Sequence, residues 1–101
     1  MWSRRGVLER DNRTCAYCVS SRFGTTLDHI MPESRLTRVE ADTWLNTIAA
    51  CLRCNGIKAH RTPEEAGIPL LFHPREITAR DTLLVAVTAT GADVVALGLV
   101  A

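Results

Sequence analysis

Two Cys-x-x-Cys pairs constrain this chain more than any other feature of its sequence. Cys15 and Cys18 form the first pair, Cys51 and Cys54 form the second, and the chain has no other cysteine. Two intervening residues let a tight turn aim both sulfurs at one point, so two such pairs can supply four thiolates to one tetrahedral Zn²⁺. The spacing therefore predicts a structural zinc site that joins two distant segments of the chain.

Two disulfides in a small secreted domain would use the same four cysteines. The N-terminal residues Met1-Trp2-Ser3-Arg4-Arg5 lead into a charged segment and lack the apolar run of a signal peptide. Disulfides persist mainly in secreted proteins, so the zinc interpretation is favoured over the disulfide one. We accordingly expect a cytoplasmic location.

Length and charge bound the class of protein. The chain has 101 residues, about the length of one small domain, whose modest core often needs a staple such as a metal. Residues 1–61 contain ten Lys or Arg against six acidic residues, whereas residues 62–101 contain two against five. The basic excess lies with the cysteines, where a polyanion could bind, although four thiolates on one zinc would subtract about two charges.

The residue pattern predicts only short elements. Val7 and Leu8 among charged residues indicate a short helix or turn, the β-branched segment before Pro32 indicates a strand, and the polar segment after it has no helical or strand period. Trp44 and Leu45 are expected to anchor the far end of that loop. The expected elements are a helix or turn over residues 3–10, a strand over 25–30, a loop over 31–42, a helix over 54–61 and a turn over 63–67.

The C-terminal segment is apolar and separates from the rest by composition. We expect residues 1–74 to form one domain and residues 75–101 to form an extension of uncertain fold. In that extension, residues 77–89 suit a helix and the last eight residues a strand or buried strip. The extension has two apolar runs, residues 83–87 and 94–101. Neither reaches the roughly 18 residues that a membrane-spanning helix needs, so no membrane segment is expected.

Several motifs in order resemble the HNH endonucleases. They are Arg10-Asp11, Cys15-x-x-Cys18, Leu27-Asp28-His29-Ile30-x-Pro32, Trp44-x-Asn46 and Cys51-x-x-Cys54-Asn55-x-x-Lys58. The resemblance implies an α+β fold, namely a small zinc-stapled ββα-metal (His-Me finger) domain with short flanking helices and an apolar C-terminal tail. It also implies a hairpin ending in Asp28-His29, an Ω-like loop, and a helix beginning near Cys54, with one divalent ion between hairpin and helix.

The resemblance implies a catalytic role for each residue of the polar cluster between and beside the cysteine pairs. His29 would be the general base, because a neutral imidazole can accept a proton near pH 7. Asp28 and Asn55 would bind the catalytic ion, and their oxygens favour Mg²⁺, Mn²⁺ or another divalent ion over tight Zn²⁺ binding. Asn46 would hydrogen-bond the loop backbone and so orient His29. Alone, these residues would more often be a surface pair, a helix cap and a turn residue.

Basic residues of the same segment are candidates for DNA backbone contacts. Lys58, Arg61, Arg35, Arg22 and Arg53 make up this set, and Lys58 could equally be a residue of a solvated helix face. Such contacts bind phosphates without reading sequence, and no recognition helix or series of stacking aromatics is evident. His60 and His73 match no position of the motif and are interpreted as surface or packing residues.

The resemblance therefore implies a metal-dependent HNH endonuclease that hydrolyses DNA by a single-metal mechanism and leaves 5′-phosphate and 3′-hydroxyl ends. It also implies that the expected cytoplasm is that of a bacterial cell or a phage-infected host. A catalytically silent zinc-knuckle module that binds nucleic acid or protein is the alternative. A homodimer, phage packaging or another protein partner could use the C-terminal tail, whose apolar surface would otherwise risk aggregation.

Overall fold

The first helix, α1 (Arg4–Arg10), is a capped amphipathic segment that supports the sheet. The Ser3 hydroxyl accepts a hydrogen bond from the backbone N–H of Gly6 at 3.0 Å and so begins the helix. Val7 and Leu8 lie on its buried face, and α1 packs against both strands. This confirms the helix expected at residues 3–10. The structure is a computed structural model, and it describes residues 1–78.

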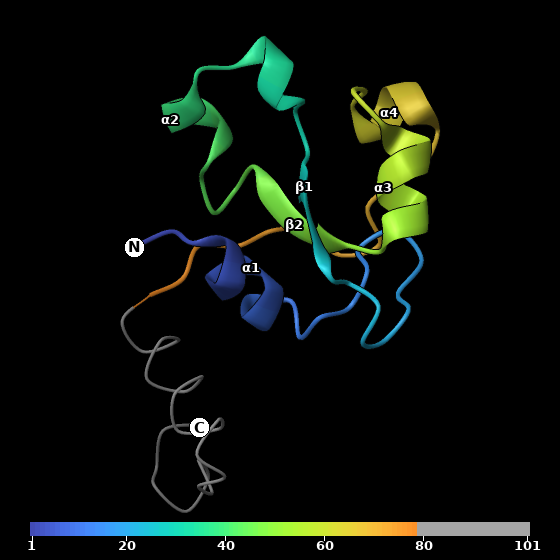
Figure 1. Cartoon of the computed structure of the whole chain (residues 1–101), viewed down its shortest axis with the longest axis horizontal. Helices are drawn as coiled ribbons and strands as arrows, with labels where there is room; N and C mark the ends of the chain where they lie inside the picture. The colour runs from blue at the N-terminus through green and yellow to red at the C-terminus, as the bar shows by residue number, and fades with distance from the viewer. Residues whose placement is uncertain (79–101) are drawn as a thin grey trace, which may run out of the picture.

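A two-stranded antiparallel sheet forms the centre of residues 1–78 (Figure 1). Strand β1 (Thr26–His29) pairs with β2 (Thr47–Ala50), with Asp28 opposite Ile48 and His29 opposite Thr47. The strand expected at residues 25–30 is thus confirmed. The two strands do not form the tight hairpin ending in Asp28-His29 that the resemblance implies. The connection between them is the long segment from Ile30 to Asn46. Asp28 and His29 end the first strand of the pair.

A buried arginine ties α1 to the sheet and to the end of the long loop. The Arg10 guanidinium lies on the Asp11 carboxylate at 2.8 Å and donates to the backbone carbonyls of Trp44 at 2.7 Å and Thr47 at 2.8 Å. Asp11 in turn accepts from the backbone N–H of Ala49 at 2.9 Å. A buried charge is tolerated when it is paired and hydrogen-bonded in this way. The network holds β2 in position relative to α1.

The segment between the strands is more ordered than the sequence predicts. It contains a 3₁₀ turn, η1 (Glu33–Arg35), and a helical turn, α2 (Arg38–Ala41). Thr37 and Glu40 form a reciprocal capping box that begins α2. The loop expected over residues 31–42 thus contains two short helical turns that the sequence did not predict, because elements of three or four residues are too short to show a hydrophobic period.

The second half of the described chain holds two short helices that lie side by side (Figure 1). Helix α3 (Leu52–Lys58) begins at Cys51, whose sulfur accepts from the backbone N–H of Cys54 at 3.4 Å. It starts earlier and ends earlier than the helix expected at residues 54–61. Helix α4 (Pro63–Ala66) has a Thr62–Glu65 capping box and ends at Gly67 in the left-handed conformation, as the turn signals at residues 63–67 predict.

The apolar core is small and is continuous with the cysteine cluster. Cys15, Tyr17 and Ala50 form a buried cluster, and Cys51, Cys54, Ile68 and Leu70 pack against it. A core of this size is characteristic of domains that depend on a metal. The helix and strand expected in the C-terminal extension lie almost wholly outside residues 1–78, as do the proposed dimer and partner contacts. Among residues 1–78, no helix is long and apolar enough to cross a membrane.

Candidate active site and zinc centre

The four cysteines converge on one point. Their Sγ atoms all lie within 4.8 Å of one another, and those of Cys18 and Cys51 are 3.9 Å apart. Tetrahedral zinc with Zn–S bonds of about 2.3 Å places its sulfurs just under 4 Å apart. All four thiols are free of disulfides, contrary to the disulfide alternative. The set therefore fits a zinc ion in number, ligand type and spacing.

The local backbone explains why the sulfurs face each other. Val19 adopts φ 52°, a conformation that a β-branched side chain rarely takes, and its N–H donates to the Cys15 carbonyl at 2.8 Å. The Ala16 N–H donates to the Ala49 carbonyl at 3.0 Å, so the first cysteine turn is attached to the end of β2, directly before Cys51. Hydrogen bonds from Ser20 lower the pKa of the Cys18 thiol to about 6. Burial raises the pKa of the Cys15 and Cys54 thiols, so a metal ion at this site would have to displace their protons.

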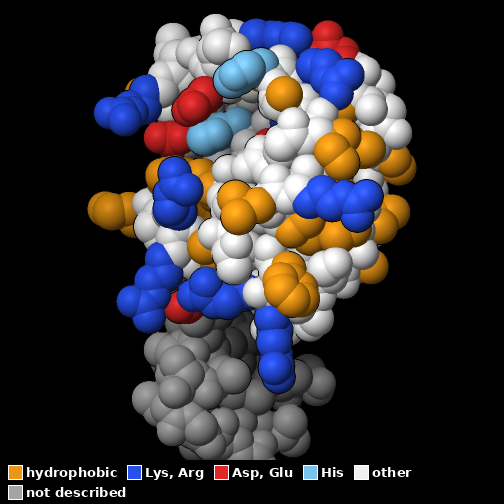
Figure 2. All heavy atoms as spheres, turned by 45° about the vertical axis from the view of Figure 1, so that its right-hand side comes forward, with side chains coloured by type: hydrophobic (Ala, Val, Ile, Leu, Met, Phe, Trp, Pro, Cys, Tyr) orange, Lys and Arg blue, Asp and Glu red, His pale blue; other side chains and the backbone are white. Residues whose placement is uncertain are grey.

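A second cluster of polar residues lines a cavity of about 230 Å³ between β1, η1 and α3. Asp28 and His29 come from the end of β1, Glu33 from η1, Asn55 from α3, and His60 from the turn after α3. Adjacent residues on an extended strand point to opposite sides, which separates the carboxylate from the imidazole. Histidine and acidic side chains gather around a hollow in this part of the surface (Figure 2). The structure thus brings Asp28, His29 and Asn55 together.

His29 is held by an acidic residue that the sequence analysis did not select. Its Nε2 lies 2.9 Å from Oδ1 of Asp42, the residue that ends α2, and 3.9 Å from Oε2 of Glu33. The His29 side chain remains 14% exposed, so it is reachable from solvent. Asp42 is one of several acids in the long loop, and nothing in its sequence context marks it. Its place beside His29 depends on the fold of α2.

Asn46 connects the two ends of the long loop. Its amide oxygen accepts from the Met31 N–H at 2.9 Å, and its amide nitrogen donates to the carbonyls of Met31 and Ala41, each at 3.2 Å. These contacts attach Asn46 to the backbone of Met31, two residues after His29, and to that of Ala41, directly before Asp42. The geometry agrees with the loop contacts expected of Asn46.

Replacing Asn46 with Ala would remove all three loop contacts at once. We expect Asn46→Ala to lower the free energy of unfolding by about 1–3 kcal/mol, because three loop hydrogen bonds would be lost, one of them part-buried. Asn46→Asp keeps the acceptor for the Met31 N–H and should lose less. Urea denaturation of both variants measures the difference. Equal stability of Asn46→Ala and the parent protein would contradict this role.

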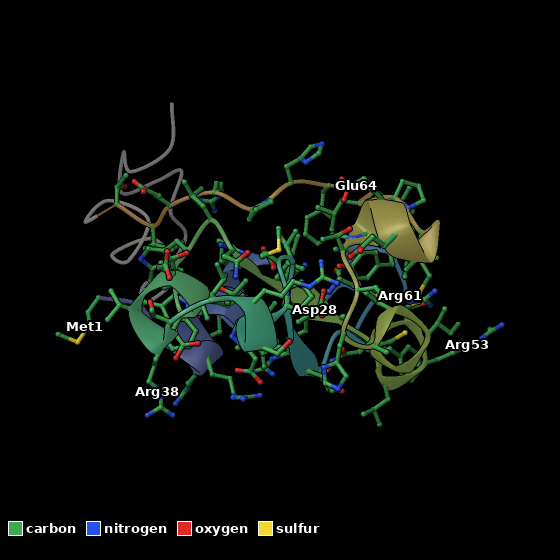
Figure 3. All side chains as sticks on the ribbon, turned by 90° about the horizontal axis from the view of Figure 1, so that it is seen from above. Met1, Asp28, Arg38, Arg53, Arg61 and Glu64 are labelled. Atoms are coloured by element: carbon green, nitrogen blue, oxygen red, sulfur yellow. The ribbon has the colours of Figure 1, made fainter. Side chains whose placement is uncertain are left out.

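Asp28 lies almost completely buried, with both carboxylate oxygens hydrogen-bonded. One oxygen is 3.3 Å from Nζ of Lys58 and the other accepts from the Tyr17 hydroxyl at 2.5 Å. Burial raises the pKa of Asp28, opposed by the hydrogen bond from Tyr17 and the charge of Lys58. Figure 3 shows Asp28 inside the molecule, whereas Arg53 extends from α3 into solvent. Each oxygen keeps a second lone pair, so a cation in the cavity could still bind.

Lys58 requires a correction to the expected set of DNA-contacting residues. Its side chain is completely buried, and its ammonium donates to the His29 carbonyl at 2.7 Å as well as to Asp28. Lys58 is therefore not on the surface that a phosphate could reach. The position three residues after Asn55 places it on the inner face of α3, because residues i and i+3 share a helix face.

Removing the charge of Lys58 should destabilise the protein strongly. We expect Lys58→Met to lower the free energy of unfolding at pH 7 by about 3–5 kcal/mol, because Asp28 would keep a buried charge without its cation. The loss should shrink as the pH falls through the raised pKa of Asp28, since the neutral carboxyl needs no cation. Urea denaturation at several pH values measures this. Lys58→Met combined with Asp28→Asn should recover much of the loss; a double variant as unstable as Lys58→Met alone would exclude the charge explanation.

Three of the expected arginines differ in whether another part of the protein already binds them. Arg35 pairs with Glu65 at 2.8 Å, joining η1 to α4, and Arg61 donates to the Ile57 carbonyl at 2.6 Å at the end of α3. Arg22 is exposed, between the first cysteine turn and β1. Arg35 and Arg61 thus have structural partners, although both remain exposed.

Asn55 is oriented with its oxygen available. Its amide nitrogen donates to the Thr26 hydroxyl at 3.1 Å and approaches the Leu27 carbonyl at 3.5 Å. With the nitrogen directed at β1, the amide oxygen is the group left for another ligand. Oxygen donors from Asn55 and Asp28 around one small cavity are the type that Mg²⁺ and Mn²⁺ prefer.

Comparison with known proteins supplies one match. Residues 15–61 match the family model described as HNH endonuclease, and this range includes all four cysteines together with Asp28, His29, Asn46 and Asn55. No curated protein and no solved structure matches the chain. HNH domains have the ββα-metal fold, and β1, β2 and α3 are its two strands and helix here. The sequence resemblance and the expected fold class are both confirmed.

Proposed function

We propose that this chain, whose residues 15–61 match the HNH endonuclease family model, is a metal-dependent endonuclease that hydrolyses DNA phosphodiester bonds at the cavity beside His29. The observation that carries the proposal is the convergence of an oriented imidazole with oxygen donors in one cavity. Hydrolysis of a phosphodiester needs a base for water, a positive charge near the phosphate and a scaffold that aligns them. The chain offers residues for all three.

His29 is the proposed general base, and Asp42 is its positioning residue. A carboxylate that accepts from Nε2 holds the neutral imidazole in the tautomer with its proton on that nitrogen. Nδ1 then has the free lone pair and takes a proton from a water molecule. The resulting hydroxide attacks phosphorus, the bond to the 3′-oxygen breaks, and that oxygen takes a proton from a solvent water molecule, while His29 returns its proton to solvent. The products are a 5′-phosphate and a 3′-hydroxyl.

Asp28 and Asn55 are the proposed residues that hold the catalytic cation, Mg²⁺, Mn²⁺ or another divalent ion. When bound, the ion supplies positive charge to the phosphate and the leaving oxygen. The charge of Lys58 favours the ionised form of Asp28 against the burial that raises its pKa, and the Thr26 hydroxyl directs the Asn55 amide. The donor set is therefore prepared by neighbouring residues.

The proposed zinc ion at the four cysteines acts through structure. Tyr17 lies within the first cysteine pair and donates to Asp28, while the second pair begins α3, which carries Asn55. Zinc would thus set the relative position of the two proposed cation-binding residues. Residues that orient ligands in this way influence metal sites strongly.

A silent binding module is the second candidate, and one observation favours it. Lys58 already neutralises Asp28, so the carboxylate has a resident cation without any metal ion. In that case the chain would bind DNA or a protein partner through its basic surface and leave phosphodiesters intact. His29 paired with Asp42 would then have no chemical task, which is why the nuclease is preferred.

Nicking of supercoiled plasmid by the zinc-loaded protein tests the proposal. We expect nicked circles in Mg²⁺ or Mn²⁺, few without added divalent ion, and resealing of the nicks by DNA ligase, which requires 5′-phosphate and 3′-hydroxyl ends. A gel shift of the plasmid without nicking, in every divalent ion tried, would support the binding module. Nicks that ligase cannot reseal would contradict the proposed ends.

A further inference from the structure

A larger hollow adjoins the proposed catalytic cavity. It has a volume of about 410 Å³, and it shares Leu27, His29, Glu33 and His60 with the smaller one. Its remaining lining comes from the N-terminal segment and the long loop, namely Trp2, Arg4, Ser34, Arg38, Ala41 and Asp42. Any group that occupies this hollow would therefore lie next to the phosphate that His29 is proposed to attack.

The Trp2 side chain forms an aromatic wall of this hollow, and a hydrogen bond fixes its position. Its indole N–H donates to the Thr47 hydroxyl at 2.9 Å, and that hydroxyl donates to the Thr43 carbonyl at 2.7 Å. The indole is thus tied to the beginning of β2, although Trp2 is the second residue of this sequence. Trp2 is half-buried and lines the hollow. Aromatic surfaces of this kind bind nucleobases by stacking, whatever the base.

Two arginines that line the hollow are exposed, and within residues 1–78 neither is held closely by an acidic side chain. The Arg38 side chain is 94% exposed, and its approach to Asp42 is a loose 4.0 Å. Arg4 is also exposed, at the start of α1. In Figure 3 Arg38 extends outward from the body of the molecule. These two arginines, unlike Arg35 and Arg61, are the cations best placed for phosphates beside His29.

The two acidic residues that line the hollow, Asp42 and Glu33, lie beside His29, where the hollow meets the proposed catalytic cavity. Asp42 is held on His29 at 2.9 Å, and Glu33 lies 3.9 Å from the same imidazole. Both therefore belong to the surroundings of the proposed base. The hollow thus combines an aromatic wall and exposed cations with a shared boundary to the proposed catalytic cavity.

We propose that the hollow binds one unstacked nucleotide next to the scissile phosphate, with its base against Trp2 and neighbouring phosphates on Arg4 and Arg38. The proposal rests on the proposed function and names its substrate class: DNA with an unpaired base at the cleavage position, such as a single strand or a flap. A base inside a duplex is stacked and paired, and it must leave the helix before it can reach an aromatic wall. Single-stranded DNA is therefore the preferred ligand.

Fluorescence anisotropy of labelled oligonucleotides tests this, with zinc-loaded protein and no other divalent ion so that no cleavage occurs. We expect a 12-nucleotide single strand to bind more tightly than the same sequence as a duplex. Trp2→Ala should weaken single-strand binding by roughly tenfold, as loss of one stacked base does, and duplex binding by less than twofold. Trp2→Phe keeps an aromatic face without the bond to Thr47 and should retain most of the affinity.

Two further variants complete the design. Phe23→Ala removes another exposed aromatic, outside the residues that line the hollow, and should bind as the parent does. Arg38→Ala should reduce the salt dependence of single-strand binding by about one phosphate contact. Unchanged single-strand binding by Trp2→Ala, or equal weakening of duplex and single strand, would overturn the proposal. Because the assay measures binding without catalysis, its failure is distinguishable from failure of the nuclease proposal, which the plasmid assay reports.

Discussion

Removal of the metal from the four-cysteine site is expected to unfold the domain. Cys15, Tyr17 and Ala50 form the buried cluster at this site, and the core has few other large apolar side chains to replace the metal. Zinc binding at such sites contributes on the order of 10–16 kcal/mol at neutral pH, which exceeds the usual stability of a small domain. Circular dichroism during titration with a chelator, together with zinc content, measures the change. Added zinc should restore the spectrum.

Substitution of one ligand tests the same expectation without a chelator. Cys15→Ser should lose zinc and the helical signal, because Cys15 is fully buried within the cluster. Ser21→Ala, an exposed change on the same segment, is the matched control and should keep both. A Cys15→Ser protein that stays folded without zinc would show that the core is sufficient by itself and would contradict the stabilising role assigned to the metal.

The parts of the site that depend on the spacing of neighbouring residues could be predicted from local sequence motifs. The two cysteine pairs come together because each is a tight turn next to β2, and Asp28 and His29 end β1 because Pro32 follows closely. Such features need only a few neighbouring residues, which is why they could be predicted without a structure.

Features that depend on distant residues could not be predicted in this way. Lys58 has the sequence context of an exposed helical lysine, and only the packing of α3 on β1 places its ammonium on Asp28. Asp42 reaches His29 because α2 folds back within the long loop. Trp2 gains a role only from its bond to Thr47 in β2. Each of these contacts joins residues that are distant in the sequence, and no sequence motif indicates that they meet.

Replacement of His29 with Ala should abolish nearly all cleavage while the protein stays folded. A positioned general base contributes about 10²–10⁴ to the rate, so a loss in that range is expected at saturating Mg²⁺. The His29 ring contacts Asp42 near the surface, and the ring does not belong to the buried cluster at the cysteines, so zinc content should not change. His73→Ala is the matched control, since His73 is an exposed histidine that lines a separate hollow with Pro63 and Leu70.

The most direct test is therefore the single-turnover rate of DNA cleavage by the parent protein, His29→Ala and His73→Ala, prepared identically and loaded equally with zinc. Metal-dependent cleavage by the parent and His73→Ala, with a rate at least about 100-fold lower for His29→Ala, is the predicted result. Equal rates for all three proteins would contradict the assignment of His29 as the base, and no cleavage by any of them would contradict the nuclease itself.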